Sequence, residues 1–261
     1  MSDNLESVAY RRKQRRKRIR RRRLLITAFV LFICAILVFV ALAFTVLLPV
    51  KNVIANGSKI YSEQELVKAS KITEKNNILT LSKDKIEENM QTSLPYVDEV
   101  KLSRKFPDTV ELKITDAKED TCFKTDDGYF IVSKSKRILK KVKKPKKGLT
   151  LIISSLNQPE ISKEITYNDD ESKEIISLLM SKAKEKNLTL NRINIKEKFS
   201  LKLRVNGRFD VLLGNSANLD KKIDHLASMI ENIGKKRTGE INLSMWTKNN
   251  SEGSFKEGKL K

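Results

Sequence analysis

The hydrophobic pattern begins with an uninterrupted apolar run from Leu24 to Leu48, in which no residue is charged. At ~1.5 Å of helical rise per residue, this run is longer than the ~30 Å hydrocarbon core of a bilayer. No polar face recurs within it, which argues against the core helix of a soluble protein. Ala41-Leu42-Ala43 has the pattern of a signal cleavage site, but the run is too long for a secretory signal and continues after that site. We therefore predict one transmembrane helix over residues 24–49.

Residues 50–117 change from the period of a strand to that of a helix and back. A short strand precedes an Asn56-Gly57 turn, and the next helix has the marks of a helix start, because Ser62 and Glu65 form a capping box. A second helix is predicted from Ser82. Two runs of alternating apolar and polar residues then flank the turn "FPDT" at 106–109. The predicted order is strand, helix, helix, strand, strand.

Residues 118–247 contain both periods in a less regular order. A hairpin is predicted around Asp127-Gly128, and a helix from Asp169. A second helix after Asn218 has a single apolar stripe, formed by Leu219, Ile223, Leu226, Ile230 and Ile233. After it, Ile241, Leu243 and Met245 alternate with polar residues, which predicts a strand. We therefore expect an α+β fold in which this second domain has an antiparallel sheet with helices packed on it, followed by an edge strand and tail at residues 248–261.

Charge is distributed unevenly along the chain. Lysine and arginine number 53 against 32 acidic residues, and from Arg11 to Arg23 every residue except Gln14 and Ile19 is basic. Basic residues that flank a span stay on the cytoplasmic side, so residues 1–23 are predicted to form a cytoplasmic tail that contacts anionic lipid. The rest of the chain is then extracytoplasmic. An arm for nucleic acid is the alternative, but no aromatic residue interleaves the block for base stacking, so no nucleic-acid partner is expected.

The part of the chain after the span resembles a known family. The segments "NGSKIYSEQEL", "NNILTLSKDKI" and "PYVDEVKLSRKFPDTVELKI" follow a single span in the order found in the POTRA domain of the FtsQ/DivIB family of bacterial cell-division proteins. The more distal part is similar to the β-domain of that family in "DVLLG", in Lys222 with Leu226, and in "GEINLS", where Asn242 replaces the usual Asp. The residues that mark the POTRA domain are Asn56, Gly57, Ser62, Glu65, Pro95, Tyr96, Val97, Arg104, Phe106, Pro107 and Thr109.

The resemblance implies a non-enzymatic scaffold of the divisome, located at the division septum. It implies binding of FtsL-like and FtsB/DivIC-like membrane proteins and control of septal peptidoglycan synthesis, with septal peptidoglycan synthase components as further partners. In the family, a partner adds a strand to the last edge of the β-domain. Trp246 and Phe255 are then either anchors for the partner or packing residues of the domain. The residues expected at this interface are Ile241, Leu243, Met245, Trp246, Ser254, Phe255 and Lys256.

The residue types present offer little for catalysis. His225 is the only histidine, and Cys34 and Cys122 are the only cysteines, so we predict no enzyme activity, no metal site and no cofactor. Cys122 is expected to be a small buried hydrophobe. The stretch Gly253–Lys259 matches all but the last position of the phosphate-binding motif G-x-x-x-x-G-K-[ST], but Leu260 stands where the motif requires a hydroxyl group.

Two functions of other classes remain open at this point. A POTRA-containing adaptor outside the divisome would share the first domain, although such domains usually occur in tandem and are joined to a barrel. A membrane protein that binds anionic wall polymer would use the excess of basic residues beyond the tail. A charge excess of this kind is more typical of a solvated surface than of a specific site.

Overall fold

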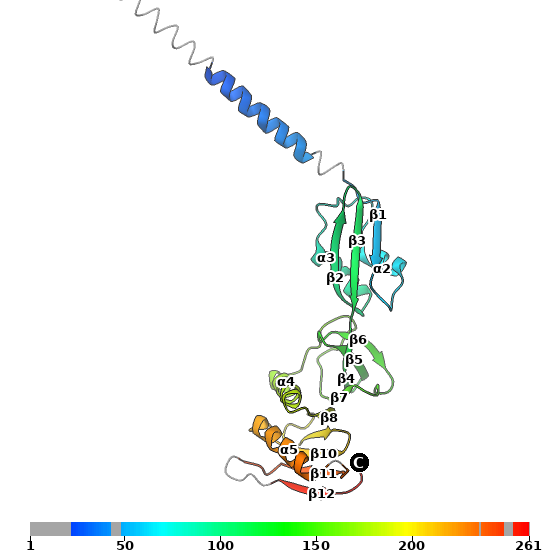
Figure 1. Cartoon of the computed structure of the whole chain (residues 1–261), viewed down its shortest axis with the longest axis vertical. Coiled ribbons are helices and arrows are strands. Elements are labelled where there is room, and N and C mark those ends of the chain that lie inside the picture. The colour runs from blue at the N-terminus through cyan, green and yellow to red at the C-terminus, as the bar shows by residue number, and fades with distance from the viewer. Residues whose placement is uncertain (1–21, 43–47, 235, 248–252, 261) are drawn as a thin grey trace, which may run out of the picture. The chain divides into compact units, whose positions relative to one another are not determined.

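The computed structural model describes residues 22–42, 48–234, 236–247 and 253–260 (Figure 1). Its N-terminal helix, Arg22–Leu42, contains an 18-residue stretch with a mean hydropathy of 3.2 and is long and apolar enough to cross a membrane, which fits the predicted single-pass protein. The predicted basic tail lies almost entirely outside the described residues. Contacts within the chain define two compact units. One contains the N-terminal helix with residues 48–54, 72–82 and 103–111, and the other contains residues 55–71, 83–102 and the described part of 112–261.

A sheet of three strands follows the N-terminal helix, with the spatial order β1-β3-β2. The predicted order of strand, helix, helix, strand, strand is confirmed. Apolar side chains from all five elements are buried, among them Ala55, Leu66, Met90, Val100 and Leu112. The elements are β1 (Asn52–Asn56), α2 (Glu63–Ser70), α3 (Lys83–Ser93), β2 (Val97–Lys105) and β3 (Thr109–Asp116).

Local chemistry explains where the first of these elements end. Gly57 has a φ of +98°, and a Cβ at this position would lie 2.4 Å from the carbonyl oxygen of Ile114, so the predicted turn requires glycine. The predicted capping box is confirmed: Ser62 Oγ accepts from the Glu65 N–H, and the Glu65 carboxylate accepts from the Ser62 N–H at 2.9 Å. The Phe106–Pro107 peptide bond in the β2–β3 turn is cis.

The second sheet has nine strands in the order β12-β11-β10-β9-β8-β7-β4-β5-β6. Most neighbouring strands are antiparallel, as predicted, but β4 with β7, β7 with β8, and β10 with β11 are parallel, so the sheet is mixed. The strands are β4 (Glu119–Thr125), β5 (Gly128–Ser133), β6 (Ile138–Val142), β7 (Thr150–Ile153), β8 (Leu190–Asn194), β9 (Leu201–Val205), β10 (Phe209–Gly214), β11 (Gly239–Asn242) and β12 (Ser254–Glu257).

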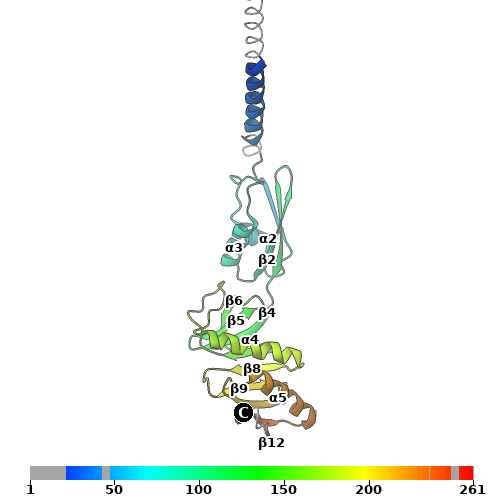
Figure 2. The same cartoon turned by 90° about the vertical axis from the view of Figure 1, so that its left-hand side faces the viewer.

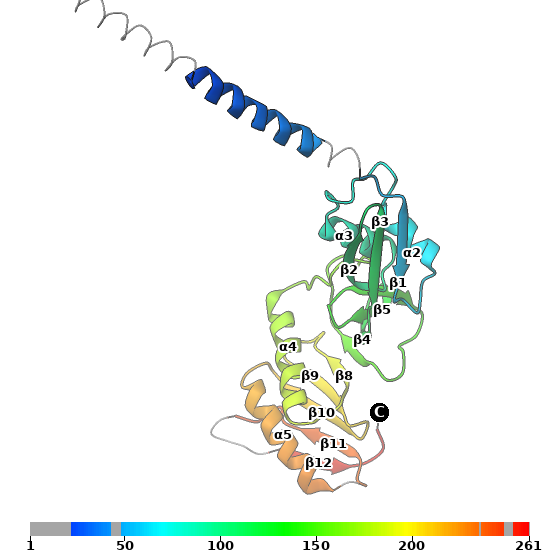
Figure 3. The same ribbon diagram turned by 45° about the horizontal axis from the view of Figure 1, so that its top comes forward.

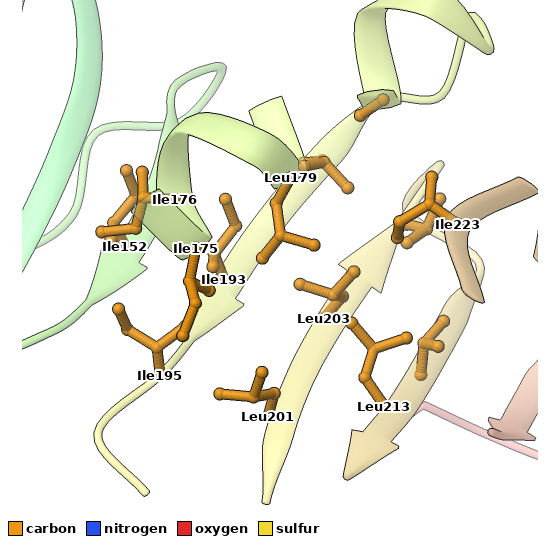
Figure 4. Packing of buried hydrophobic residues seen from close by; sticks show 14 of the residues in the cluster. Ile152, Ile175, Ile176, Leu179, Ile193, Ile195, Leu201, Leu203, Leu213 and Ile223 are labelled. Carbon is orange, nitrogen blue, oxygen red and sulfur yellow. The ribbon is translucent and has the colours of Figure 1, made fainter. Parts of the chain in front are cut away.

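Two helices cover one face of this sheet. They are α4 (Asp170–Glu185) and α5 (Leu219–Ile233), and in Figure 2 α4 runs across the front of the strands. Ile175 and Leu179 from α4 and Ile223 from α5 pack with inward-facing residues of β8, β9 and β10, such as Ile193 and Leu203 (Figure 4). The stripe predicted for α5 is buried at its first four positions and partly buried at Ile233.

On the opposite face of the sheet, the described residues form a second apolar cluster around β4, β5, β6 and β7. There Ala117, Cys122, Ile131 and Leu139 form a smaller core. Cys122 is fully buried, and burial raises the pKa of its thiol, which disfavours the reactive thiolate. The prediction that Cys122 is a small buried hydrophobe is therefore confirmed.

The predicted strand through Ile241, Leu243 and Met245 is shorter than its alternation indicates. Strand β11 ends at Asn242, because the Asn242 Oδ1 atom accepts hydrogen bonds from the backbone N–H of Ser244 at 2.9 Å and from its hydroxyl at 2.8 Å. Met245 consequently lies outside the strand and is 79% exposed. The extension of the strand to Met245 was therefore wrong.

Candidate partner-binding edge

Strand β12 is the last strand at one end of the nine-stranded sheet (Figure 3). It pairs antiparallel with β11, and Ile241 lies opposite Phe255 in the register. Within the described residues, no strand pairs with the other side of β12. The edge predicted from the sequence at residues 254–256 therefore coincides with a sheet edge of four residues.

The direction of the backbone groups on β12 follows from the hydrogen bonds on either side of β11. The N–H groups of Gly239 and Leu243 donate to carbonyl oxygens of Arg208 and Leu212 on the β10 side. The backbone N–H and C=O groups of the odd-numbered residues of β11 therefore point toward β10. On the other side, the Gly258 N–H donates to the Thr238 carbonyl oxygen at 3.1 Å. Even-numbered residues therefore make the hydrogen bonds between β11 and β12.

Backbone groups alternate in direction along an antiparallel strand. Since Glu240 pairs with Lys256 in the hydrogen-bonded register, the N–H and C=O of Lys256 face β11. Those of Phe255 and Glu257 point outward, away from the sheet. The edge thus offers two residues whose donors and acceptors can receive a further strand.

Phe255 is placed by packing on the domain. Its ring meets that of Phe209 edge to face, with 6.1 Å between the centroids, and the Arg237 guanidinium lies 5.1 Å from its centroid. Gly239 makes room for it, because a Cβ there would lie 2.9 Å from the Phe255 ring. Arg237 also binds the Glu257 carboxylate at 2.8 Å. Phe255 therefore attaches β12 to the sheet, and its ring is only partly accessible.

The other residues predicted at the interface divide into buried and exposed groups. Ile241 and Leu243 are fully buried, and Trp246 is 8% exposed and part of the main core. The Trp246 Nε1 atom is buried without a hydrogen-bond partner. Ser254 and Lys256 are exposed, as is Met245. A partner at this edge would therefore meet Ser254, Lys256 and the margin of Phe255, all on β12.

The sheet face opposite α4 and α5 carries a row of charged residues that ends on β12. The strand registers place Arg192, Arg204, Asp210, Glu240 and Lys256 next to one another on successive strands. Arg204 and Asp210 form a two-pronged ion pair with both distances at 2.8 Å. Several of these side chains line a groove of about 450 Å³. Along the row, two basic residues are followed by two acidic residues and one basic residue. A partner with complementary charges would therefore fit this face in one orientation better than in the other.

Lys222, which with Leu226 carries part of the resemblance to the β-domain, has a structural role that the sequence did not reveal. It is 1% exposed, and its Nζ donates to the carbonyl oxygens of Leu213 at 2.8 Å and of Asn215 at 3.0 Å. Desolvation by burial lowers its pKa. The ammonium group therefore holds the loop between β10 and α5 against the start of α5. The position of Lys222 three residues after Leu219 in the apolar stripe was the available signal.

The residues that mark the first domain have structural contacts. Arg104 donates to the carbonyl oxygens of Ile78 and Leu81 at 2.8 and 2.7 Å. The Tyr61 hydroxyl accepts from the Tyr96 N–H at 3.2 Å. Further contacts of the marked residues are hydrogen bonds from the Arg137 guanidinium to the Val97 carbonyl oxygen and from the Thr109 hydroxyl to the Asp108 carboxylate. The contacts of Arg104 and Tyr61 lie within the first domain, whereas Arg137 comes from the segment before β6.

The features considered for catalysis are not brought together. The imidazole of His225 lies 6.4 Å from the Trp246 ring, measured between centroids. Residues 254–257 of the P-loop-like stretch form strand β12, whereas a phosphate-binding loop would lead into a helix. Among the described residues, no group of three or more His, Cys, Asp or Glu side chains could hold a metal ion.

The fold defines a class of protein: an apolar helix, a small β-α-α-β-β domain and a mixed sheet with helices on one face. Residues 48–116 match the POTRA domain of the FtsQ type. The chain is 23% identical over 238 residues to the cell division protein DivIB of Clostridium botulinum strain Hall, which covers 89% of this chain and 90% of that protein. DivIB of Clostridium acetobutylicum is 26% identical over 69% of this chain and 73% of its own length. The chain is thus a relative of the DivIB proteins with an FtsQ-type POTRA domain, and the predicted resemblance to the FtsQ/DivIB family is confirmed.

Proposed function

We propose that this protein is a non-enzymatic scaffold of bacterial cell division, which binds FtsL-like and FtsB/DivIC-like membrane proteins at the septum. The relatives named as cell division proteins, which match about nine-tenths of the chain, support the role in cell division. The outer edge of β12, with which no strand of the described residues pairs, supports the mode of binding, because a partner segment can extend the sheet there. Control of septal peptidoglycan synthesis would follow from the partners that the scaffold assembles.

The β12 edge is the observation that carries this proposal. A partner strand would bond to the outward N–H and C=O groups of Phe255 and Glu257, and its side chains would meet Ser254 and Lys256. The charged row on the uncovered sheet face continues from Lys256, so a partner segment that extends beyond the edge could pair its own charges with Glu240 and Asp210. Backbone bonds would supply affinity, and these side chains would supply selectivity.

Glu257→Pro tests the edge. Proline removes the outward N–H that a partner strand would use, and it is tolerated on an edge strand because the inward bonds between β11 and β12 come from other residues. We expect the full chain with this substitution to lose co-purification of a DivIC-like partner. Glu257→Ala is the matched control, since it removes the same carboxylate and its ion pair with Arg237 but keeps the N–H.

The two variants separate the possible results. Loss of binding in Glu257→Pro with binding retained in Glu257→Ala supports strand addition at β12. Equal binding by both variants would remove this edge as the docking site. Phe255→Pro, the more direct substitution, should also abolish binding, but it removes the packing of the ring on Phe209 as well and is therefore the less specific test.

A further inference from the structure

The end of the first domain that receives the chain from the N-terminal helix exposes apolar side chains. Phe106, in the turn between β2 and β3, is 60% exposed, and Leu79, in the loop before α3, is 43% exposed. Large apolar side chains that are exposed to water have a higher free energy than the same side chains covered by apolar groups. The position of these two side chains in the domain therefore indicates what could cover them.

Hydrogen bonds place both segments beside the point where the chain enters the domain. The Ile78 N–H donates to the Leu48 carbonyl oxygen at 3.0 Å, and the Val50 N–H donates to that of Asn76 at 3.0 Å. The Lys51 N–H donates to the Asp108 carbonyl oxygen at 2.8 Å. The loop before α3 and the β2–β3 turn therefore flank the entry segment, residues 48–51, directly.

The covalent chain keeps this entry segment close to the bilayer. The apolar run extends to Leu48, and it is several residues longer than the ~20 needed to cross the hydrocarbon core. Between Leu42 and Leu48 the chain reaches at most ~20 Å, even if fully extended. The surface that flanks the entry segment is thus kept within reach of the lipid headgroups, whichever side of the membrane the domain occupies.

Charge on the same surface is largely compensated. Lys51 pairs with Asp108 at 3.8 Å, and Lys105 pairs with Glu111 at 2.8 Å. The Arg104 guanidinium donates to the two loop carbonyl oxygens described above. Attraction to anionic lipid is therefore a weak term here, and burial of apolar surface is the stronger one.

We propose that Phe106 and Leu79 form a membrane seat, which inserts into the headgroup region of the bilayer next to the span and anchors the first domain on the lipid surface. Aromatic and large aliphatic side chains are suited to this depth, where the apolar part of a protein surface leaves water. Because the seat acts through apolar burial, its contact with lipid is independent of anionic lipid content and of salt.

Tryptophan fluorescence in vesicles tests the seat. Phe106→Trp and Leu79→Trp are each introduced into the full chain, which is reconstituted in phosphatidylcholine vesicles whose acyl chains carry bromine as a quencher. We expect the emission of each new indole to be shifted to the blue and largely lost to quenching. The unsubstituted chain supplies the baseline, because its single tryptophan, Trp246, is buried.

Phe199→Trp is the matched control, since Phe199 is 87% exposed but lies in the loop between β8 and β9, far along the chain from the entry segment. Its emission should stay that of a hydrated indole without quenching. Emission of Phe106→Trp and Leu79→Trp that matches the control would overturn the proposal. So would quenching that appears only when anionic lipid is added. This fluorescence readout does not depend on partner binding, so it tests the membrane seat independently of the proposed scaffold function.

Discussion

Glu119, at the start of β4, is the acceptor for three donors. Its carboxylate accepts from the Tyr96 hydroxyl at 2.7 Å, pairs with Lys140 at 3.1 Å and binds the Lys146 ammonium. Burial alone would raise the pKa of Glu119, but hydrogen bonds from Lys146, Tyr96 and Lys140 outweigh it and lower the pKa to about 2. The carboxylate joins Tyr96 of the first domain to Lys140 and Lys146 of the second, all within one compact unit.

The lowered pKa predicts a stability that depends on acid pH. A carboxylate with a depressed folded-state pKa contributes fully above its unfolded value, and the contribution is lost as pH falls from about 4.5 through about 2. We expect the folded chain to lose on the order of 1 kcal/mol over this window, beyond what Glu119→Gln loses. Denaturant titrations of both proteins in detergent, at the two ends of the window, measure the difference. Parallel curves would contradict the assignment.

At the scale of elements, Phe255 is the residue of β12 whose side chain packs against the main core. Phe255→Ala removes the contact with Phe209 and should weaken the docking of β12 by roughly 1–3 kcal/mol. The N–H groups of Glu240 and Asn242, which face β12, should then exchange hydrogen faster, while that of Leu243, bonded to β10, stays protected. Amide hydrogen exchange resolved by residue measures this alternation.

Lys256→Ala is the control for this element, because Lys256 is exposed and its side chain makes no core contact in the described structure. Its amide exchange pattern along β11 should equal that of the unsubstituted chain. If Phe255→Ala leaves the exchange of Glu240 and Asn242 unchanged, the Phe255 ring does not hold the strand. A uniform increase along β11 would instead indicate that the whole sheet end opens.

Features that depend on neighbours within a few residues could be predicted from the sequence. Features that depend on residues far away along the chain could not. The capping box at Ser62 and the stripe of α5 depend on neighbours within a few residues, and both are as predicted. Alternation indicates which face of a strand is buried but not which strand lies beside it, so the parallel neighbours of β7 were missed. The buried Lys222 was missed because its partners are carbonyl oxygens, which leave no pattern in the sequence.

The candidate site shows the same division. The edge at residues 254–256 was predicted correctly as a strand, but the side chains offered there differ from expectation. The sequence left open whether Trp246 and Phe255 are anchors or packing residues, since an aromatic side chain has the same sequence pattern in both settings. Their neighbours decide: Trp246 packs in the main core, and Phe255 meets Phe209. Their role toward a partner stays a prediction.

At the scale of the whole molecule, the distribution of charge predicts an orientation. The block from Arg11 to Arg23 precedes the N-terminal helix, and basic residues resist transfer across the membrane, so the domains after the helix should be extracytoplasmic. The cysteines leave a clean background for testing this. Cys34 lies within the N-terminal helix, and Cys122 is fully buried.

We expect a membrane-impermeant thiol reagent to label Phe199→Cys in intact cells, because position 199 is in an exposed loop of the second sheet. Ser2→Cys, placed before the basic block, should be labelled only after the membrane is opened. The unsubstituted chain controls for reaction at Cys34 and Cys122. The reverse pattern, with Ser2→Cys labelled first, would mean that the basic block does not set the orientation, and a partner outside the cytoplasm could then not reach the β12 edge.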